Sequence, residues 1–289
     1  MSHFLFNCLF RLLTRLPLAW LHRFGVLLGW LSYRFSPSYA ARIRDNLRQS
    51  GLAHDGHILT AAIKETGKGI AELPWVWGRP YDEVLAKVRE CAGLEHIETA
   101  QARGKGIIFL TPHLGCFEIS ALYAAQRMPI TVLYRPPKLA FLEELMCRGR
   151  ERGQARLAKA DVSGVRLLYK ALKRGEAIGL LPDQVPSLGE GEWVEFFARP
   201  AYTMTLAGRL AEKSGATVLI AYSERLPRGR GYVIHVKPLL LDFRQAVPRQ
   251  INAALERVIA ACPGQYLWGY NRYKVPPGAS ASATTGGNS

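Results

Sequence analysis

A histidine and a glutamate lie five residues apart in TPHLGCFE, which covers residues 111–118. The segment follows IIFL at 107–110, a continuous apolar run typical of a strand covered on both faces. Sites of α/β sheets lie at the carboxyl ends of such strands. We therefore expect Glu118, in the first turns of the next helix, to hold one ring nitrogen of His113. The other nitrogen would take a proton from a hydroxyl that attacks a carbonyl.

Polar side chains also follow two further apolar runs. Arg135 comes after ITVLY, and Asp183 and Gln184 come after AIGLLP. Because parallel strands end at one edge of a sheet, all three are expected near the histidine. The Arg135 guanidinium suits a phosphate, Asp183 is expected to orient Arg135 or another basic side chain, and Gln184 to hydrogen-bond a substrate hydroxyl or amide. The alternative is a surface arginine held by the prolines after it and two residues that cap loops.

Cys116 offers an alternative chemistry, in which a thiol activated by His113 forms an acyl-thioester intermediate. A small buried apolar role is more typical of a cysteine in the first turn after a strand. The five cysteines lie at positions 8, 91, 116, 147 and 262, with no Cys-x-x-Cys pair and no histidine cluster beside them. We expect a reducing setting with no metal and no disulfide framework.

The elements that must position these residues alternate between helical and strand patterns, which indicates an α/β domain. Helices are expected at 38–48, 58–73, 81–91, 115–127, 139–152, 163–174, 203–213 and 248–261, and strands at 107–110, 130–134, 177–181, 216–223 and 231–237. The last two strands should pair antiparallel across the turn PRGRG. The predicted fold is a single catalytic domain with a mixed, mainly parallel sheet flanked by helices.

Two other groups of residues have both a functional and a plain interpretation. Trp193, Phe196 and Phe197 follow a glycine-flanked loop and could hold an acyl chain or belong to the core. A basic patch, expected to be largely helical, is made of Arg148, Arg150, Arg152, Arg156 and Lys159. It is either a contact for an acidic protein or anionic headgroups, or a solvated face.

Residues 4–35 are far more apolar than the rest, yet arginines interrupt them and no charge-free stretch has the length of a standard membrane span. Arg11, Arg15 and His22 fall on one helical stripe, as expected for a helix in the headgroup region or snorkelling from a tilted span. Pro17 is expected to break the helix. A retained membrane-anchoring helical segment is therefore predicted over residues 1–37, with a buried core helix as the alternative.

The formal net charge of +15 and the pI near 9.8 favour anionic partners: nucleic acid, anionic lipid or an acidic carrier protein. The basic residues are spread along the chain and form no run of five, so a nucleic-acid partner is not expected. The small, polar tail 276–289 is predicted to be disordered.

Four blocks in order resemble one family. They are GLEHIETAQARGKGIIFLTPHLGCFE, ITVLYRPPK, LLPDQVPSLGEGEWVEFFARPAYTMTLAGRLAEKSGATVLIAYSERL and QYLWGYNRYK. A His–Glu spacing alone is common, but the four together resemble the late acyltransferases of lipid A biosynthesis (lauroyl/myristoyl type), in the lysophospholipid acyltransferase superfamily. The resemblance covers roughly residues 40–275. The chain has Cys116 and Phe117 where the family commonly has Asn and Trp.

The resemblance implies a glycerolphosphate acyltransferase-like catalytic domain over 38–275, with His113 and Glu118 as the catalytic His-x4-Asp/Glu pair and His113 as the base. It implies direct transfer from acyl carrier protein to a hydroxyl of a lipid A precursor glycolipid. Arg135, Asp183 and Gln184 would bind substrate, and no cofactor would be required. The enzyme would work at the membrane surface of the bacterial inner membrane, with its catalytic domain on the cytoplasmic face.

Two alternatives remain at this stage. The first is an acyltransferase for another glycolipid or for a lysophospholipid, although the Glu-Gly-Thr-Arg block of the lysophospholipid branch is missing. The second is a basic membrane-surface or nucleic-acid-binding protein without catalysis, which salt-sensitive binding of nucleic acid would reveal.

Overall fold

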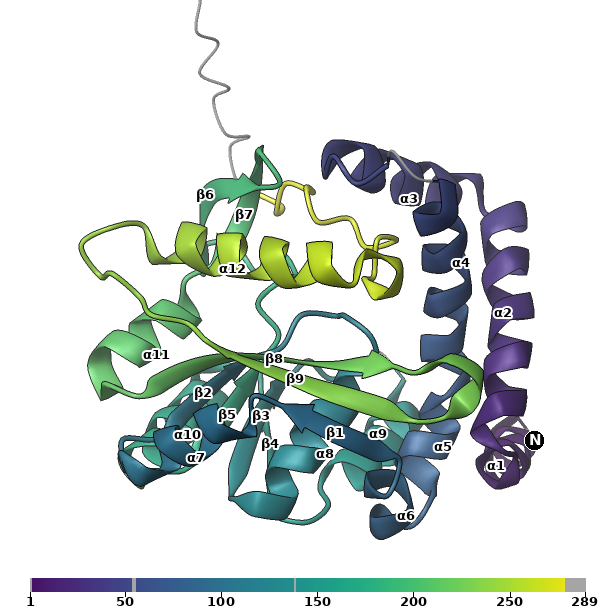
Figure 1. The fold of residues 1–289 in the computed structure, drawn as a ribbon, viewed down its shortest axis with the longest axis horizontal. Helices are drawn as coiled ribbons and strands as arrows, with labels where there is room; N and C mark the ends of the chain where they lie inside the picture. Colours follow the sequence, from purple (N-terminus) through teal and green to yellow (C-terminus); the bar gives the residue numbers. More distant parts are fainter. Residues whose placement is uncertain (1, 54–55, 138, 279–289) are drawn as a thin grey trace, which may run out of the picture.

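The sheet at the centre of the molecule is mixed and mainly parallel, as predicted (Figure 1). A computed structural model of the chain describes residues 2–53, 56–137 and 139–278. The seven strands run in the order β1-β9-β8-β2-β5-β3-β4. Only β8 and β9 pair antiparallel, which confirms the pairing expected across the PRGRG turn. All other neighbours are parallel, so β2, β3, β5 and β8 end at one edge.

The strands of this sheet are short. Their bounds are β1 Val88–Ala92, β2 Ile107–Leu110, β3 Ile130–Tyr134, β4 Ala155–Lys159, β5 Ala177–Leu180, β8 Thr217–Arg225 and β9 Tyr232–Pro238. A separate antiparallel hairpin consists of β6 Gly191–Phe196 and β7 Arg199–Met204.

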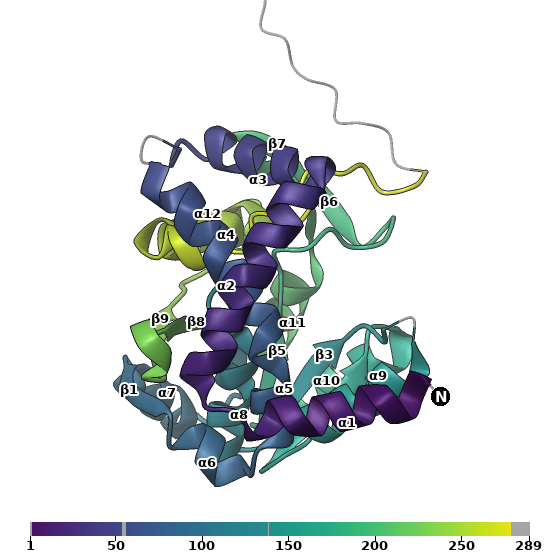
Figure 2. The same ribbon diagram turned by 90° about the vertical axis from the view of Figure 1, so that its right-hand side faces the viewer.

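Helices cover both faces of the sheet (Figures 1 and 2). Their bounds are α1 Ser2–Arg15, α2 Leu18–Phe35, α3 Pro37–Gln49, α4 Gly56–Ala71, α5 Leu73–Gly78, α6 Tyr81–Leu85, α7 Leu94–Ala102, α8 Phe117–Arg127, α9 Ala140–Arg150, α10 Val162–Lys173, α11 Leu206–Ser214 and α12 Val247–Ala261, with short 3-10 turns η1 Pro227–Gly229 and η2 Pro263–Gln265. One core contains residues of α3, α4, α10, α11 and α12, and the other contains residues of α2 and α5 to α8.

Strand β2 shows why its sequence is an unbroken apolar run. Ile108 and Leu110 pack into the first core, and Ile107 and Phe109 pack into the second. Successive strand residues point to opposite faces, so a strand covered on both sides needs an apolar residue at every position.

Three sequence predictions about these elements were wrong. The helix expected over 81–91 ends at Leu85, and β1 follows it. The helix expected from 203 begins at Leu206, because β7 runs to Met204. Strand β4 lay in a segment taken as part of a basic helical patch. Both β1 and β4 are edge strands with exposed charged residues, so they lack the apolar pattern that identified the central strands.

The N-terminal segment forms two helices, and Pro17 separates them as expected. Within the part of the chain that the structure describes, no helix is long and apolar enough to cross a membrane. Helix α2 instead packs along α4, as both views show. Gly25 and Gly67 allow this contact, because a Cβ on Gly67 would lie 1.9 Å from the carbonyl oxygen of Gly25.

The prediction that His22 lies on an outward polar stripe of the N-terminal helix is wrong. This side chain is 4% exposed and lies 3.0 Å from a carboxylate oxygen of Glu72. The outward faces of α1 and α2 carry large apolar side chains: Leu5, Leu9, Leu12, Trp20, Phe24, Leu27, Leu31 and Phe35. In the tail expected to be disordered, 276–278 form no helix or strand, and 279–289 lie outside the described residues.

Candidate active site

His113 lies in the loop between β2 and α8, at the carboxyl edge of the sheet. The carbonyl of His113 accepts a hydrogen bond from the N–H of Leu267 (3.0 Å), and the N–H of Gly115 donates to the carbonyl of Gln265 (3.0 Å). Gly115 has a φ of 61° and lies so close to β8 that a Cβ would be 2.0 Å from the carbonyl oxygen of Ser223. Only glycine fits this position without strain. The loop is therefore fixed on both sides, by β8 and by the segment after α12.

Asp183 is the residue that holds the histidine ring. Its Oδ1 lies 2.8 Å from Nδ1 of His113, and its Oδ2 accepts the backbone N–H of the same residue at 2.9 Å. Burial acts to raise the pKa of Asp183, but the attraction and hydrogen bonds from His113 outweigh it and hold the pKa below its ordinary value. An ionised Asp183 favours the tautomer with a proton on Nδ1, which leaves the lone pair of Nε2 free to accept a proton.

The side chain of Gln184 lies against the second ring nitrogen, Nε2. Its side-chain amide lies 3.1 Å from Nε2 of His113. An amide N–H donated to Nε2 is the arrangement that the proton on Nδ1 requires. A substrate hydroxyl would take the same place, so Gln184 is positioned to make way for a reacting group.

The predicted hydrogen bond between Glu118 and His113 is wrong, because both ring nitrogens have other partners. Glu118 is the second residue of α8 and points toward α9, where it forms a two-point ion pair with Arg150. Its carboxylate also accepts the indole N–H of Trp77, in α5, at 3.1 Å. The ring of Phe117, not the carboxylate, lies against the imidazole, with 4.8 Å between ring centres.

Arg135 lies at the same edge as His113, as expected, but Asp183 does not orient it. Its one hydrogen-bond contact with the described residues is a 3.5 Å approach to the hydroxyl of Ser187. His113, Arg135 and Gln184 all line one cleft of about 540 Å³. The residues that follow the strands therefore lie at one edge of the sheet, as expected. The hydrogen-bonded pairs that they form differ from those expected.

A smaller apolar cavity adjoins this cleft beneath α8. Four residues line both: Phe117, Leu133, Arg150 and Leu181. The rest of its lining comes from the sheet and from α7 and α8, for example Val132, Gly179 and Ile97. The cleft therefore continues from His113 into a small apolar space.

The alternative thiol nucleophile is disfavoured by the surroundings of Cys116. The side chain is 3% exposed. Burial, and then the negative charge of Glu72, raise its pKa well above the ordinary value. A thiol kept protonated is a poor nucleophile. Cys116 therefore fits the small buried apolar role.

The two phenylalanines after β5 and two of the five basic-patch residues have structural contacts, whereas Arg148, Arg156 and Lys159 remain exposed. Phe196 belongs to the core, and Phe197 packs on it and on Trp268. Arg150 is paired with Glu118, and Arg152 donates to the backbone carbonyls of Val76, Arg79 and Gly149. These two arginines are therefore engaged within the protein and are not available to the predicted contact patch.

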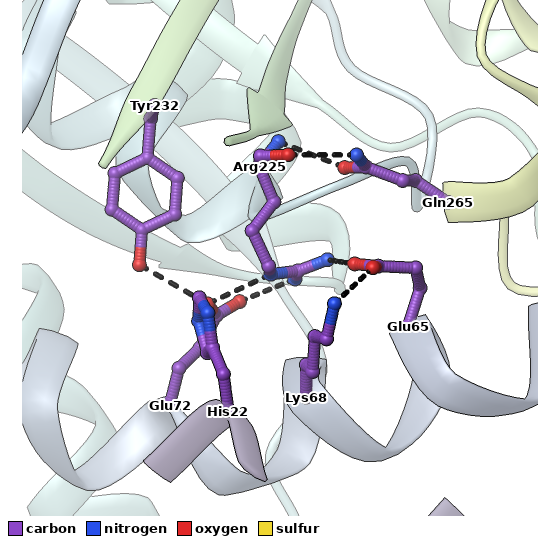
Figure 3. A network of polar contacts seen from close by, with 7 residues as sticks. All are labelled: His22, Glu65, Lys68, Glu72, Arg225, Tyr232 and Gln265. Carbon is purple, nitrogen blue, oxygen red and sulfur yellow. Dashed lines mark hydrogen bonds and ion pairs between the residues drawn. The ribbon is translucent and has the colours of Figure 1, made fainter. Parts of the chain in front are cut away.

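A buried network beneath the catalytic loop was not found from the sequence (Figure 3). Arg225, 3% exposed, forms a two-point ion pair with Glu72 and a second ion pair with Glu65. Tyr232 donates to Glu72, and His22 lies against the same carboxylate. Burial acts to raise the pKa of Glu72, but the charge and hydrogen bonds of Arg225, with those of His22, lower it to about 2. The network joins α2 and α4 to the end of β8.

Gln265 links this network to the catalytic loop. Its side chain accepts from the N–H of Arg225 (2.8 Å) and donates to the carbonyl of the same residue (2.9 Å). Its own carbonyl accepts from Gly115, next to the histidine. The one sequence signal for this arrangement is an arginine at the end of the apolar strand β8.

The comparisons with known proteins agree with this description. The chain matches the profile of the bacterial lipid A biosynthesis acyltransferases over residues 1–275. It is 29% identical to the lipid A biosynthesis lauroyltransferase of Escherichia coli (strain K12), covering 92% of this chain and 89% of that protein. The palmitoleoyltransferase of the same pathway and strain is 27% identical, covering 85% and 77%. The myristoyltransferase of that strain is 27% identical, covering 61% and 56%.

These matches identify the protein as an acyltransferase. The chain belongs to the bacterial lipid A biosynthesis acyltransferase family, as its four sequence blocks indicated, and it acts in acyl transfer in lipid A biosynthesis.

Proposed function

We propose that this acyltransferase moves a fatty acyl chain from an acyl carrier protein thioester to a hydroxyl of a lipid A precursor, with His113 as the general base. The observation that carries the proposal is the position of His113 between a buried carboxylate and the cleft: Asp183 holds Nδ1, and Nε2 faces the cleft side chain of Gln184. This geometry suits proton abstraction from a hydroxyl that displaces Gln184.

In the proposed reaction, the acceptor hydroxyl gives its proton to Nε2 while its oxygen attacks the thioester carbonyl carbon. The tetrahedral intermediate collapses with cleavage of the C–S bond, and the departing sulfur takes the proton from His113. Asp183 stabilises the imidazolium in between. No covalent acyl-enzyme is formed, and the buried Cys116 takes no part.

Cationic side chains are proposed to stabilise the oxyanion. Each backbone N–H from His113 to Cys116 already donates within the protein: to Asp183, to the carbonyl of Pro112, to Gln265 and to Ser223 respectively. Arg135 and Arg150 line the cleft and carry fixed positive charge. Such charges act strongly on an oxyanion in a site from which water is excluded.

The outward face of the N-terminal helices is proposed to rest on the cytoplasmic surface of the bacterial inner membrane. Exposed aromatic and leucine side chains lie beside arginines on this face: Arg23 stacks over Trp20, and Arg34 over Phe35. Apolar side chains with adjacent cations are typical of helices that lie in a headgroup region. A lipid acceptor and an acidic carrier protein would meet the basic enzyme there.

Acyl transfer in detergent micelles tests the reaction. Purified protein is given a panel of acyl carrier protein thioesters and a lipid A precursor, and mass spectrometry measures the lipid. We expect a product heavier by one acyl group, absent with His113→Ala and retained with Cys116→Ala. Activity with coenzyme A thioesters alone would reject the donor, product only with another glycolipid or a lysophospholipid would reject the acceptor, and full activity of His113→Ala would reject the base.

A further inference from the structure

Four arginines line the catalytic cleft, and three of them, from separate elements, have no ion pair with the described residues. Arg135 follows β3, Arg166 lies in α10 and Arg209 lies in α11. Helices α10 and α11 contact each other on the same side of the molecule (Figure 1). Sequence analysis identified only Arg135, because Arg166 and Arg209 sit inside amphipathic helices, where a basic residue is an ordinary solvated position.

Two of these guanidinium groups have no counter-charge among the residues that the structure describes. Among the described residues, no acidic side chain lies within ion-pair distance of Arg166 or Arg209, and neither has a hydrogen-bond partner there. Arg135 has only the long approach to Ser187. Three positive charges therefore remain available on the walls of one cleft.

The acidic side chains that line the same cleft, Asp161 and Glu190, accept hydrogen bonds from within the protein. Asp161 accepts from the N–H of Gly164 (2.9 Å) and the hydroxyl of Ser163 (2.6 Å), which caps α10. Glu190 accepts the N–H of Ser187 at 3.1 Å. Neither carboxylate forms an ion pair with an arginine of the cleft, and the three arginines without ion pairs exceed the two carboxylates by one positive charge, which favours an anion.

The less exposed arginines of the protein, including Arg150 on the same cleft, have partners. Arg150 has Glu118, Arg225 has Glu72 and Glu65, and Arg272 donates to the carbonyl of Tyr202 and the hydroxyl of Thr203. Arg135, Arg166 and Arg209 are exposed, and they differ from other exposed arginines such as Arg148 because they line the cleft that contains His113. Guanidinium groups bind phosphate through two parallel hydrogen bonds, which gives direction as well as charge.

We propose that Arg166 and Arg209, together with Arg135, form a binding site for a phosphate group of one of the two reactants. This proposal rests on the function proposed above, since both reactants of that reaction carry phosphate. The phosphate belongs either to the glycolipid acceptor or to the phosphopantetheine arm of the donor. In either case the three arginines hold the phosphate of a reactant in the cleft that contains His113.

The test compares Arg166→Gln and Arg209→Gln with Lys170→Gln, a matched loss of charge at an exposed position of α10 that does not line the cleft. KM and kcat are measured for each reactant. Loss of one charged hydrogen-bonding group is expected to raise KM for the phosphate-bearing reactant about tenfold or more, with a smaller effect on kcat. Lys170→Gln should leave both constants near wild type, and Arg166→Lys should restore part of the affinity.

Truncated reactants identify the source of the phosphate. One arm uses an acceptor without its phosphates, and the other uses an acyl-pantetheine in place of an acyl-phosphopantetheine. If the acceptor supplies the phosphate, the arginine variants and wild type become equally poor with the dephosphorylated acceptor. If the donor supplies it, the same convergence occurs with acyl-pantetheine. Arginine variants with unchanged KM for every reactant would overturn the proposal.

A binding measurement separates this proposal from the proposed reaction. Calorimetric titration of the whole protein with pyrophosphate needs no turnover. Binding that Arg166→Gln and Arg209→Gln weaken and Lys170→Gln does not would support the arginine site even if no acyl transfer were found. Transfer activity together with pyrophosphate binding that is equal in all variants would reject the arginine site and leave the reaction intact.

Discussion

The carboxylate of Asp183 accepts two hydrogen bonds from His113, one from the ring nitrogen Nδ1 at 2.8 Å and one from the backbone N–H at 2.9 Å. One oxygen sets the tautomer and direction of the ring, and the other fixes the loop that carries it. The residue that orients the histidine therefore comes from the end of another strand, seventy positions later in the chain, and not from the neighbouring helix.

Asp183→Asn is expected to lower kcat by roughly 10² to 10⁴, the range seen when a histidine base loses its oriented tautomer. KM should change little, since Asp183 is buried behind the ring. Steady-state kinetics with a circular dichroism spectrum to show retained folding would measure this. The partner assignment is rejected if Asp183→Asn keeps full activity.

Glu118→Gln is expected to act mainly through stability. The substitution leaves Arg150, whose side chain is 23% exposed, without its counter-charge, and the cost should be about 2 kcal/mol. Thermal unfolding would show a lower midpoint than wild type, while Glu98→Gln, at an exposed position of α7, should not. Unchanged stability with abolished turnover would instead give Glu118 a direct catalytic role.

The buried Glu72 predicts a loss of stability in acid. Its pKa in the folded protein is about 2, below the ordinary value of 4.5. A carboxyl with a lowered folded pKa contributes stability that is fully present above the unfolded pKa and is lost as the pH falls toward the folded pKa. The window is therefore pH 4.5 to 2. Urea unfolding should show the difference between wild type and Glu72→Gln shrinking across this window, and a constant difference would contradict the assignment.

Charges placed on the outward face of α2 should reduce membrane binding. Phe24→Glu and Leu31→Glu put a carboxylate where apolar side chains face outward, and each is expected to lower binding to anionic vesicles about tenfold. Leu240→Glu is the control, because Leu240 is 90% exposed in the connection between β9 and α12, on the opposite side of the molecule from α2 (Figure 1). Vesicle flotation measures the bound fraction. Equal loss in all three variants would reject α2 as the contact.

The central part of the fold could be predicted because its strands carry a strong local signal. Strands β2, β3 and β5 are apolar along their length, and their order in the chain places Arg135, Asp183 and the histidine loop at one edge. Edge strands β1 and β4 carry exposed charges instead of a continuous apolar run, and β1 also pairs with β9, far later in the chain. Their residues therefore lack the local signal of the central strands.

The pairs within the site could not be predicted for the same reason. The ends of the parallel strands predict which residues lie near His113. The direction of the Glu118 side chain depends instead on how α8 begins and on the position of Arg150 on α9. The pair of Glu72 and Arg225 joins positions 153 residues apart. Such contacts follow from the finished packing of helices on the sheet and leave no spacing in the sequence.

The loop that holds His113 is completed by hydrogen bonds from Leu267 and to Gln265. The ribosome makes the loop early and these two partners late. A nascent chain, or a fragment cut before Gln265, would contain every residue of the proposed proton transfer, but Asp183 would hold the loop without these two hydrogen bonds. Complete ordering of the histidine loop therefore depends on a segment that the ribosome makes only after α12.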